Sequence, residues 1–196
     1  MISHIKKFVL ISPPKTASVS LTDALRQMID IKQIIPQIEG CYDYIESDNS
    51  LPAKHKTAED YKKYTTDYHV TGCVRNPFDR LVSWWKWIPK FDKSFTGCTF
   101  EDFLTHKITS LPIFNPQFNF FTINGVMSVD TFIKFENLQQ DFDTFCSNVN
   151  IDYIPLPNMN RSHKKCYTEY YDNTTYNIVT SKYEKDIEYF GYQFGK

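Results

Sequence analysis

Two short segments, far apart in the chain, carry side chains that proteins use to bind phosphate groups. Lys15 follows an apolar run at residues 8–11, and Arg75 follows a second apolar run at residues 70–74, with Ser83 on the stretch behind it. In both places a strand-like run passes through a polar turn into a pattern that predicts a helix. A helix N-terminus presents unpaired N–H groups and partial positive charge, so each segment combines two features that bind anions. Together the two segments predict a ligand that is anionic at both ends.

The rest of the chain supplies the elements that must position these segments. Short apolar runs alternate with stretches whose apolar residues recur at helical spacing. This alternation predicts an α/β fold with a central, mainly parallel sheet covered on both faces. In such sheets ligands bind at the carboxyl ends of the strands, which is where both segments lie. The expected strands cover residues 8–12, 68–74 and 129–135. Two expected helices begin at residues 18 and 77, and four others cover residues 58–64, 99–106, 138–149 and 174–188.

Length and composition fit one domain over residues 1–196 of ordinary globular type. The net charge of −1 gives no general attraction to nucleic acid or to anionic membranes, so an anion site must be local. No apolar run approaches the roughly 18–20 residues that cross a bilayer, and the N-terminus is a poor secretion signal. The five cysteines form no C-x-x-C pair, which predicts reduced thiols, no metal site and a cytoplasmic location.

The Lys15 segment departs from the phosphate loop of nucleoside-triphosphate enzymes. That loop needs glycines around its Lys-Ser/Thr pair, so that backbone N–H groups can wrap the phosphates. Here Lys15-Thr16 is present, but the sequence has no glycine before Gly40. An ordinary triphosphate loop is therefore disfavoured, and the segment alone also fits a strand-to-helix turn with a solvated lysine. The Arg75 segment has a similar alternative, in which Asn76 merely caps a helix and the charged side chains pair with neighbours.

Taken in order along the chain, these and later segments resemble the sulfotransferases that use 3′-phosphoadenosine 5′-phosphosulfate (PAPS). Residues 15–20, Lys-Thr-Ala-Ser-Val-Ser, resemble that family's 5′-phosphosulfate loop. Residues 75–83 are similar to its 3′-phosphate motif, R-[DN]-P-x-[DE]-R-x-x-S, at every defined position. Residues 132–142 look like the RFENL…DF segment of the carbohydrate-type branch, and residues 156–194 resemble its C-terminal stretch. The resemblance therefore covers nearly the whole chain.

The resemblance implies a P-loop-NTPase-like three-layer sandwich, PAPS as the donor, 3′,5′-adenosine bisphosphate (PAP) as the product, and an acceptor hydroxyl, with a carbohydrate favoured by the branch. Lys15 would neutralise charge on the transferring sulfuryl group, backbone N–H groups of residues 16–20 would hold the 5′-phosphate, and Arg75 with Ser83 would bind the 3′-phosphate. Catalysis would rest on positioning and electrostatic stabilisation, by analogy with phosphoryl transfer. The implied donor-binding residues are Lys15, Thr16, Ala17, Ser18, Val19, Ser20, Arg75, Ser83, Arg161 and Lys164.

Transfer also needs a base that takes the proton from the acceptor hydroxyl, and histidine is the usual side chain near neutral pH. Of the five histidines, His55 is the favoured catalytic residue, because it precedes a helix in a loop and related bacterial sequences often show a similar K-H-x-T-A stretch. The alternative is a surface histidine beside two lysines. His163, in the basic cluster at residues 160–165, is the second candidate, and that cluster could instead close over the nucleotide.

Two further positions bear on the donor and the acceptor. Many family members carry threonine where this chain has Val19, so one hydroxyl donor to the 5′ end is missing unless Ser18 or Ser20 replaces it. Loss of one hydrogen bond would weaken donor binding by roughly 0.5–1.5 kcal/mol. Gln117, after Pro116, matches a Pro-Gln pair often seen in this branch and is predicted to face the acceptor.

Two other functions compete with sulfuryl transfer. The first is a nucleotide kinase or other P-loop phosphotransferase, but the missing glycines and the lack of an obvious strand-end aspartate for magnesium count against it. The second is a non-catalytic nucleotide-binding protein of the same fold, with which Val19 and the short chain are consistent. The presence of Lys15 and of a candidate base argues against this second alternative.

Overall fold

The structure is a computed structural model that describes residues 1–28, 55–108, 112–152, 155–156 and 165–196. The chain divides into two compact units. Unit 1 comprises Met1–Val74 and Asn119–Asn160, and unit 2 comprises Arg75–Phe118 and Arg161–Lys196. Each unit carries one of the two predicted phosphate segments. The prediction of a single domain over residues 1–196 stays a prediction.

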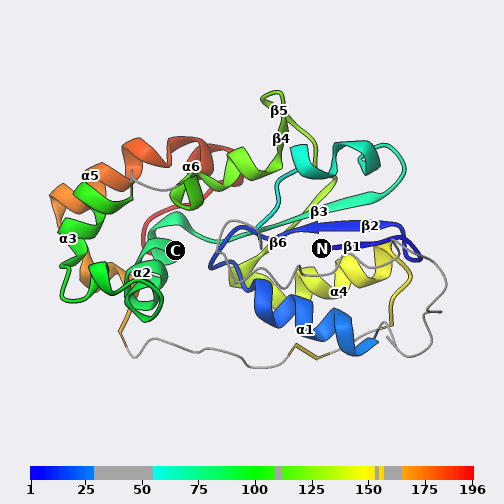
Figure 1. Ribbon diagram of the computed structural model, residues 1–196, viewed down its shortest axis with the longest axis horizontal. Helices are drawn as coiled ribbons and strands as arrows, with labels where there is room; N and C mark the ends of the chain where they lie inside the picture. The colour runs from blue at the N-terminus through cyan, green and yellow to red at the C-terminus, as the bar shows by residue number, and fades with distance from the viewer. Residues whose placement is uncertain (29–54, 109–111, 153–154, 157–164) are drawn as a thin grey trace. The chain divides into compact units, whose positions relative to one another are not determined.

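Unit 1 is built on a four-stranded sheet in the order β1-β2-β3-β6 (Figure 1). The strands β2 (Phe8–Ile11), β3 (His69–Val74) and β6 (Thr131–Lys134) run parallel, and β1 (Ile2–Ser3) pairs antiparallel with β2. β2 is buried along its whole length, as its continuous apolar sequence requires in a strand covered on both faces. The predicted α/β fold with a mainly parallel sheet is confirmed.

One face of this sheet packs against two helices, α1 (Ser18–Met28) and α4 (Leu138–Asn148) (Figure 1). Apolar residues recur in both helices at the spacing of one helix face, so each helix presents an apolar stripe to the strands. Burial of one large apolar side chain contributes about 1.5–3 kcal/mol. The core formed by the helices and strands consists of Phe8, Leu10, Leu21, Ala24, Leu25, Cys73, Ile133, Phe142, Phe145, Cys146, Val149 and Ile151.

The opposite face of the sheet packs against Phe121, which ends a short 3₁₀ segment. The ring of Phe121 contacts the ring of Phe132 in β6 edge to face, with 5.2 Å between the ring centroids. A Cβ atom at Gly72 of β3 would lie 2.7 Å from atoms of both rings, so this close approach requires glycine. Successive side chains of a strand point to opposite faces, which explains why the next residue, Cys73, joins the core on the other side.

Unit 2 is built from the helices α2 (Pro77–Trp87), α5 (Asn173–Lys182) and α6 (Glu184–Phe190). The prediction of one continuous helix over residues 174–188 is wrong, because the helix is interrupted at Tyr183 and forms two helices. The backbone of Tyr183 has φ −109° and ψ 22°, and its fully buried side chain donates a hydrogen bond to the carbonyl oxygen of Phe114 at 2.6 Å. Packing around Tyr183 thus interrupts a helix that the sequence pattern predicts to be continuous.

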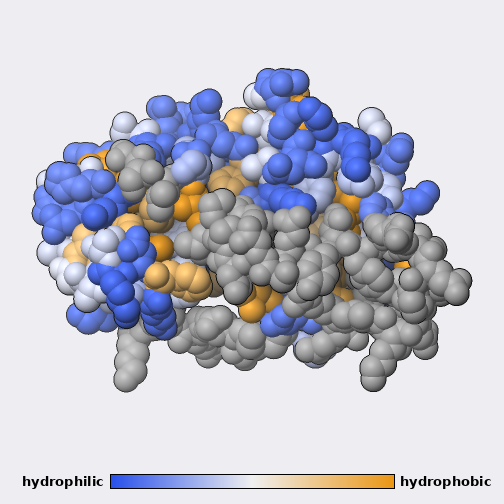
Figure 2. Space-filling model, viewed as in Figure 1, coloured by the Kyte–Doolittle hydropathy of each residue, from blue (hydrophilic) through white to orange (hydrophobic). Residues whose placement is uncertain are grey.

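The remaining elements of the described chain are short. Residues 122–127 form a small antiparallel hairpin. Its turn is Asn124-Gly125, and both turn residues have positive φ. No described helix is long and apolar enough to span a membrane. Most of the described surface visible in Figure 2 is hydrophilic, and apolar side chains show there as smaller areas. The short remaining elements of the described chain are η2 (Glu59–Tyr64), η3 (Ile88–Lys90), η4 (Lys93–Phe95), α3 (Phe100–Asp102), η5 (Phe103–Lys107), η6 (Pro112–Phe114), η7 (Gln117–Phe121), β4 (Thr122–Ile123), β5 (Val126–Met127), η8 (Phe135–Asn137) and η9 (Tyr167–Tyr170).

Candidate functional site

The loop between β2 and α1 carries the predicted 5′-phosphate residues. Its backbone is left-handed at Lys15 and at Ala17, each with φ +70°. Residues other than glycine rarely adopt this conformation, which costs an L-residue about 1–2 kcal/mol. Turns that include such residues align successive backbone N–H groups into concavities that bind anions. The loop therefore holds a conformation associated with glycine although it contains none.

Thr16 fixes this loop from within. Its side chain is fully buried, and its hydroxyl donates a hydrogen bond to the carbonyl oxygen of Pro13 at 2.7 Å. Its own carbonyl oxygen accepts a hydrogen bond from Sγ of Cys73 in β3, also at 2.7 Å. The loop is thereby tied to the neighbouring strand. Because the hydroxyl of Thr16 is engaged inside the loop, the predicted contact of this residue with the donor is through its backbone N–H.

α1 begins at Ser18, immediately after the left-handed Ala17. The N–H groups of a first helical turn have no acceptor within the helix, so they are available to an anion. Ser18 is half-buried and Ser20 is buried, whereas Val19 is 51% exposed. An apolar side chain thus lies exposed at the helix end where the resemblance leads us to expect a hydroxyl.

His55 is hydrogen-bonded to the start of the same loop. Its Nδ1 lies 2.8 Å from the carbonyl oxygen of Ser12. A carbonyl oxygen can only accept, so Nδ1 carries the hydrogen and the neutral ring has its lone pair on Nε2. Within unit 1 the structure therefore brings the favoured base to the loop that contains Lys15. The ring is half-buried and in the tautomer that a proton acceptor at Nε2 requires.

Other described histidines contact aromatic or hydroxyl side chains. Nδ1 of His4 lies 2.7 Å from the hydroxyl of Tyr68, and Nε2 of His69 lies 3.0 Å from Oγ1 of Thr131. These contacts give both rings structural roles in unit 1. Three predicted residues lie outside the described part of the chain, namely the second candidate base His163 and the donor-binding candidates Arg161 and Lys164.

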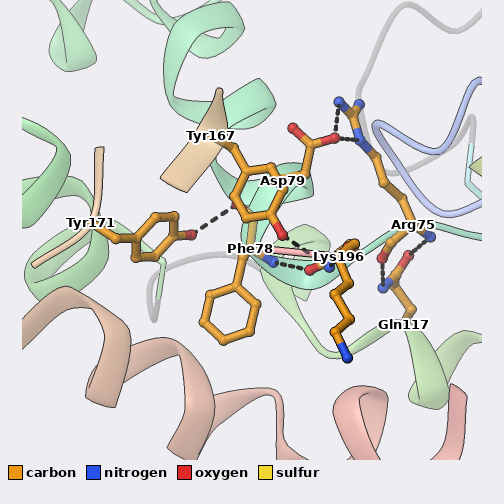
Figure 3. A network of polar contacts seen from close by, with 8 residues as sticks. Arg75, Phe78, Asp79, Gln117, Tyr167, Tyr171 and Lys196 are labelled. Atoms are coloured by element: carbon orange, nitrogen blue, oxygen red, sulfur yellow. Dashed lines mark hydrogen bonds and ion pairs between the residues drawn. The ribbon is translucent and has the colours of Figure 1, made fainter. Parts of the chain in front are cut away.

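Arg75 begins unit 2 and follows the last residue of β3. Its Nε and Nη2 lie 2.9 and 2.7 Å from Oδ2 of Asp79, at the start of α2 (Figure 3). The side chain of Arg75 is only 8% exposed, so this ion pair is well shielded and fixes the orientation of the guanidinium. Ser83, the other predicted 3′-phosphate residue, is buried further along α2 in the same unit.

Gln117 holds the main chain of Arg75 rather than its side chain. Oε1 of Gln117 accepts from the N–H of Arg75 at 2.9 Å, and Nε2 donates to the carbonyl oxygen of Arg75 at 2.8 Å (Figure 3). Gln117 is fully buried. These contacts give Gln117 a structural role in unit 2, and its predicted contact with the acceptor stays a prediction.

Two other residues of the motif at 75–83 serve the fold. Asn76 caps α2, because its Oδ1 accepts from the N–H of Phe78 at 3.1 Å, and its Nδ2 donates to the carbonyl oxygen of Gln193 at 2.9 Å. Arg80 is fully buried and donates to main-chain carbonyl oxygens, including that of Ile113 at 3.3 Å. Burial lowers the pKa of Arg80. The motif therefore includes the helix cap and the charged side chains bonded to neighbours that its alternative interpretation expected.

One comparison with known proteins identifies the family of the chain. A family model described as the sulfotransferase family matches residues 1–193. No curated protein and no solved structure matches the chain. The matched range contains the Lys15 loop, His55 and the Arg75 motif, and the family supports the transfer of sulfuryl groups as the general activity. Because the match extends over nearly the whole sequence, the chain belongs to the sulfotransferase family.

Proposed function

We propose that the chain is a PAPS-dependent sulfotransferase that moves a sulfuryl group to an acceptor hydroxyl, with a carbohydrate as the favoured acceptor. One observation in unit 1 supports this most strongly. A glycine-free loop with left-handed Lys15 and Ala17 has His55 hydrogen-bonded to the carbonyl oxygen at its start, at 2.8 Å. A cationic side chain, a helix N-terminus and a candidate base thus belong to one local structure.

The chemistry of the residues fits a donor with phosphate groups at two positions. Lys15 and the first turn of α1 suit the 5′-phosphosulfate end, and Arg75 suits the 3′-phosphate end. The two segments follow β2 and β3, which are neighbouring parallel strands, and this supports the P-loop-like three-layer sandwich that we also propose. When bound, PAPS supplies the activated sulfuryl group. Three further points stay predictions: donor binding by Arg161 and Lys164, the absence of a metal, and a cytoplasmic location.

Each residue of unit 1 has a distinct role in this proposal. The ammonium group of Lys15 stabilises negative charge that develops on the bridging oxygen. Backbone N–H groups of residues 16–20 hold the 5′-phosphate. Nε2 of His55 accepts the proton of the acceptor hydroxyl, and the hydrogen bond from Nδ1 to Ser12 keeps the ring in the required tautomer.

Calorimetry with PAP, AMP and ATP tests the donor class. We expect the chain to bind PAP much more tightly than AMP, because only PAP offers a 3′-phosphate to Arg75. A preference for ATP would instead support the phosphotransferase alternative, and equal binding of PAP and AMP would overturn the proposed donor. Strong PAP binding without any transfer from PAPS to hydroxyl acceptors would support the non-catalytic alternative.

A pair of variants tests the assigned roles. Lys15→Ala is expected to abolish sulfuryl transfer, whereas Arg75→Ala mainly weakens PAP binding. Lys62→Ala is a matched control, because Lys62 lies on η2 and its exposed side chain pairs with Glu59 at 2.8 Å. Transfer at the wild-type rate by Lys15→Ala protein would contradict the mechanism.

A further inference from the structure

Asp186, in α6, is a buried carboxylate surrounded by N–H donors. Its Oδ2 accepts from the main-chain N–H of Gln117 at 2.8 Å and from Nε2 of Gln117 at 3.1 Å. Its Oδ1 accepts from the N–H of Phe118 at 2.8 Å. Burial raises the pKa of Asp186, while these donors and the charge of Arg80 act in the opposite direction. Such hydrogen bonds offset the cost of burying a carboxylate, and here they fix both the main chain and the side chain of Gln117.

Gln117 in turn binds the main chain of Arg75 in the way that a paired strand residue would. Its amide accepts from the N–H and donates to the carbonyl oxygen of Arg75, at 2.9 and 2.8 Å. Two residues of an antiparallel pair exchange the same two hydrogen bonds. The main chain of Arg75 is therefore held by Gln117, and its guanidinium is held by Asp79 (Figure 3). A side chain fixed at both ends binds a ligand with little loss of conformational entropy.

We propose that Gln117 and Asp186 are positioning residues for Arg75, and that they set the preference of the protein for a nucleotide that carries a 3′-phosphate. This inference rests on the proposed function, in which Arg75 binds that phosphate. Asp186 orients Gln117, and Gln117 sets the direction in which the side chain of Arg75 leaves its main chain. Neither residue touches the nucleotide in this proposal.

The variant Gln117→Met tests the inference, because it conserves volume in a buried position but removes both side-chain bonds to Arg75. We expect the affinity for PAP to fall about tenfold, as when one charge-assisted hydrogen bond is misaligned. The affinity for AMP, which lacks the 3′-phosphate, should change by less than about twofold. In an Arg75→Ala background, Gln117→Met should change neither affinity further, because the residue that it positions is absent.

Gln139→Met is the matched control. Gln139 lies in α4 of unit 1, and its Oε1 also accepts from a main-chain N–H, that of Leu156 at 2.8 Å. This variant should leave both affinities unchanged. Asp186→Asn is the second test variant, since it keeps the shape of the side chain but presents a donor where N–H groups need an acceptor. It should weaken PAP binding selectively, like Gln117→Met.

The outcomes separate the inference from the proposed function. If the wild-type protein binds PAP no better than AMP, the proposed function fails. If the wild-type protein prefers PAP and Arg75→Ala abolishes that preference, but Gln117→Met and Asp186→Asn retain it, the positioning role alone is overturned. An equal loss of affinity for PAP and AMP, or a further loss in the Arg75→Ala background, would also overturn it. If neither variant folds, the contacts serve stability alone and the inference fails.

Discussion

Ala17 holds a backbone conformation that its side chain disfavours. The left-handed conformation costs an L-residue about 1–2 kcal/mol, and glycine avoids this cost but loses about 0.5–1 kcal/mol more through chain entropy. With φ +70° at Ala17, we expect Ala17→Gly to raise the free energy of unfolding by up to about 1 kcal/mol. Urea denaturation measures this difference. Ala24→Gly, in the buried stripe of α1, should have the opposite sign, and a loss of stability in Ala17→Gly would contradict the assigned strain.

The hydrogen bond between His55 and Ser12 allows the proposed role of His55 as the base to be tested without disturbing the loop. In His55→Asn the side-chain amide can still donate to the carbonyl oxygen of Ser12, but it cannot accept a proton. We expect kcat for sulfuryl transfer to fall by about 10²–10⁴, with PAP affinity unchanged. His4→Asn is the control, because His4 contacts Tyr68 and has no assigned role in transfer. A wild-type kcat for His55→Asn would leave His163 as the next candidate.

A local motif in the sequence singles out candidate residues, but it does not indicate the contacts that those residues make with distant parts of the chain. Lys15 and His55 were predicted separately as catalytic residues, and within unit 1 His55 is hydrogen-bonded to Ser12 at the start of the loop that contains Lys15, while their catalytic roles stay predictions. Gln117 was also singled out, but its amide binds Arg75 and its N–H binds Asp186, which is 69 positions away in the chain. No local pattern indicates which buried carboxylate will meet which amide, because the fold creates that contact.

At the scale of elements, the start of α1 offers a test of the departure at Val19. This residue lies at the beginning of α1 and is 51% exposed, so threonine fits there without loss of core packing. If Ser18 and Ser20 do not replace the missing hydroxyl, Val19→Thr should tighten PAP binding by roughly 2–10-fold, the value of one hydrogen bond. Calorimetry measures the change. Unchanged affinity would show that the 5′-phosphate of PAP already has all its hydrogen-bond donors in the wild-type protein.

Elements with strong periodic patterns were predicted closely. The expected strand at 8–12 and the expected helix at 138–149 correspond to β2 and α4. The hairpin of β4 and β5 was not predicted, although Asn124-Gly125 is a strong turn signal. Its strands are so short that they show no alternating pattern. The interruption at Tyr183 had no local signal, since it depends on a contact with Phe114.

At the scale of the whole molecule, the chain contains separate spectroscopic and chemical probes for its two units. All three tryptophans lie in α2 of unit 2, and Trp84 is fully buried. Cys73 and Cys146 lie in the core of unit 1, and neither forms a disulfide bond within the described part of the chain. Tryptophan fluorescence therefore reports on unit 2, and protection of the two buried thiols reports on unit 1.

The prediction of a single domain requires both units to unfold in one transition. Burial raises the pKa of Cys146 to about 11, so near neutral pH this thiol is protonated as well as shielded and should react only after unfolding. Cys166 is exposed, and the hydroxyl of Thr168 lowers its pKa, so it should react in the native state and faster as the pH rises. We expect the urea midpoint of tryptophan fluorescence to coincide with that of Cys146 labelling, with Cys166 as the native-state control. Two separated midpoints would show that the units unfold independently, because a cooperative domain cannot expose the core of one unit while the other stays folded.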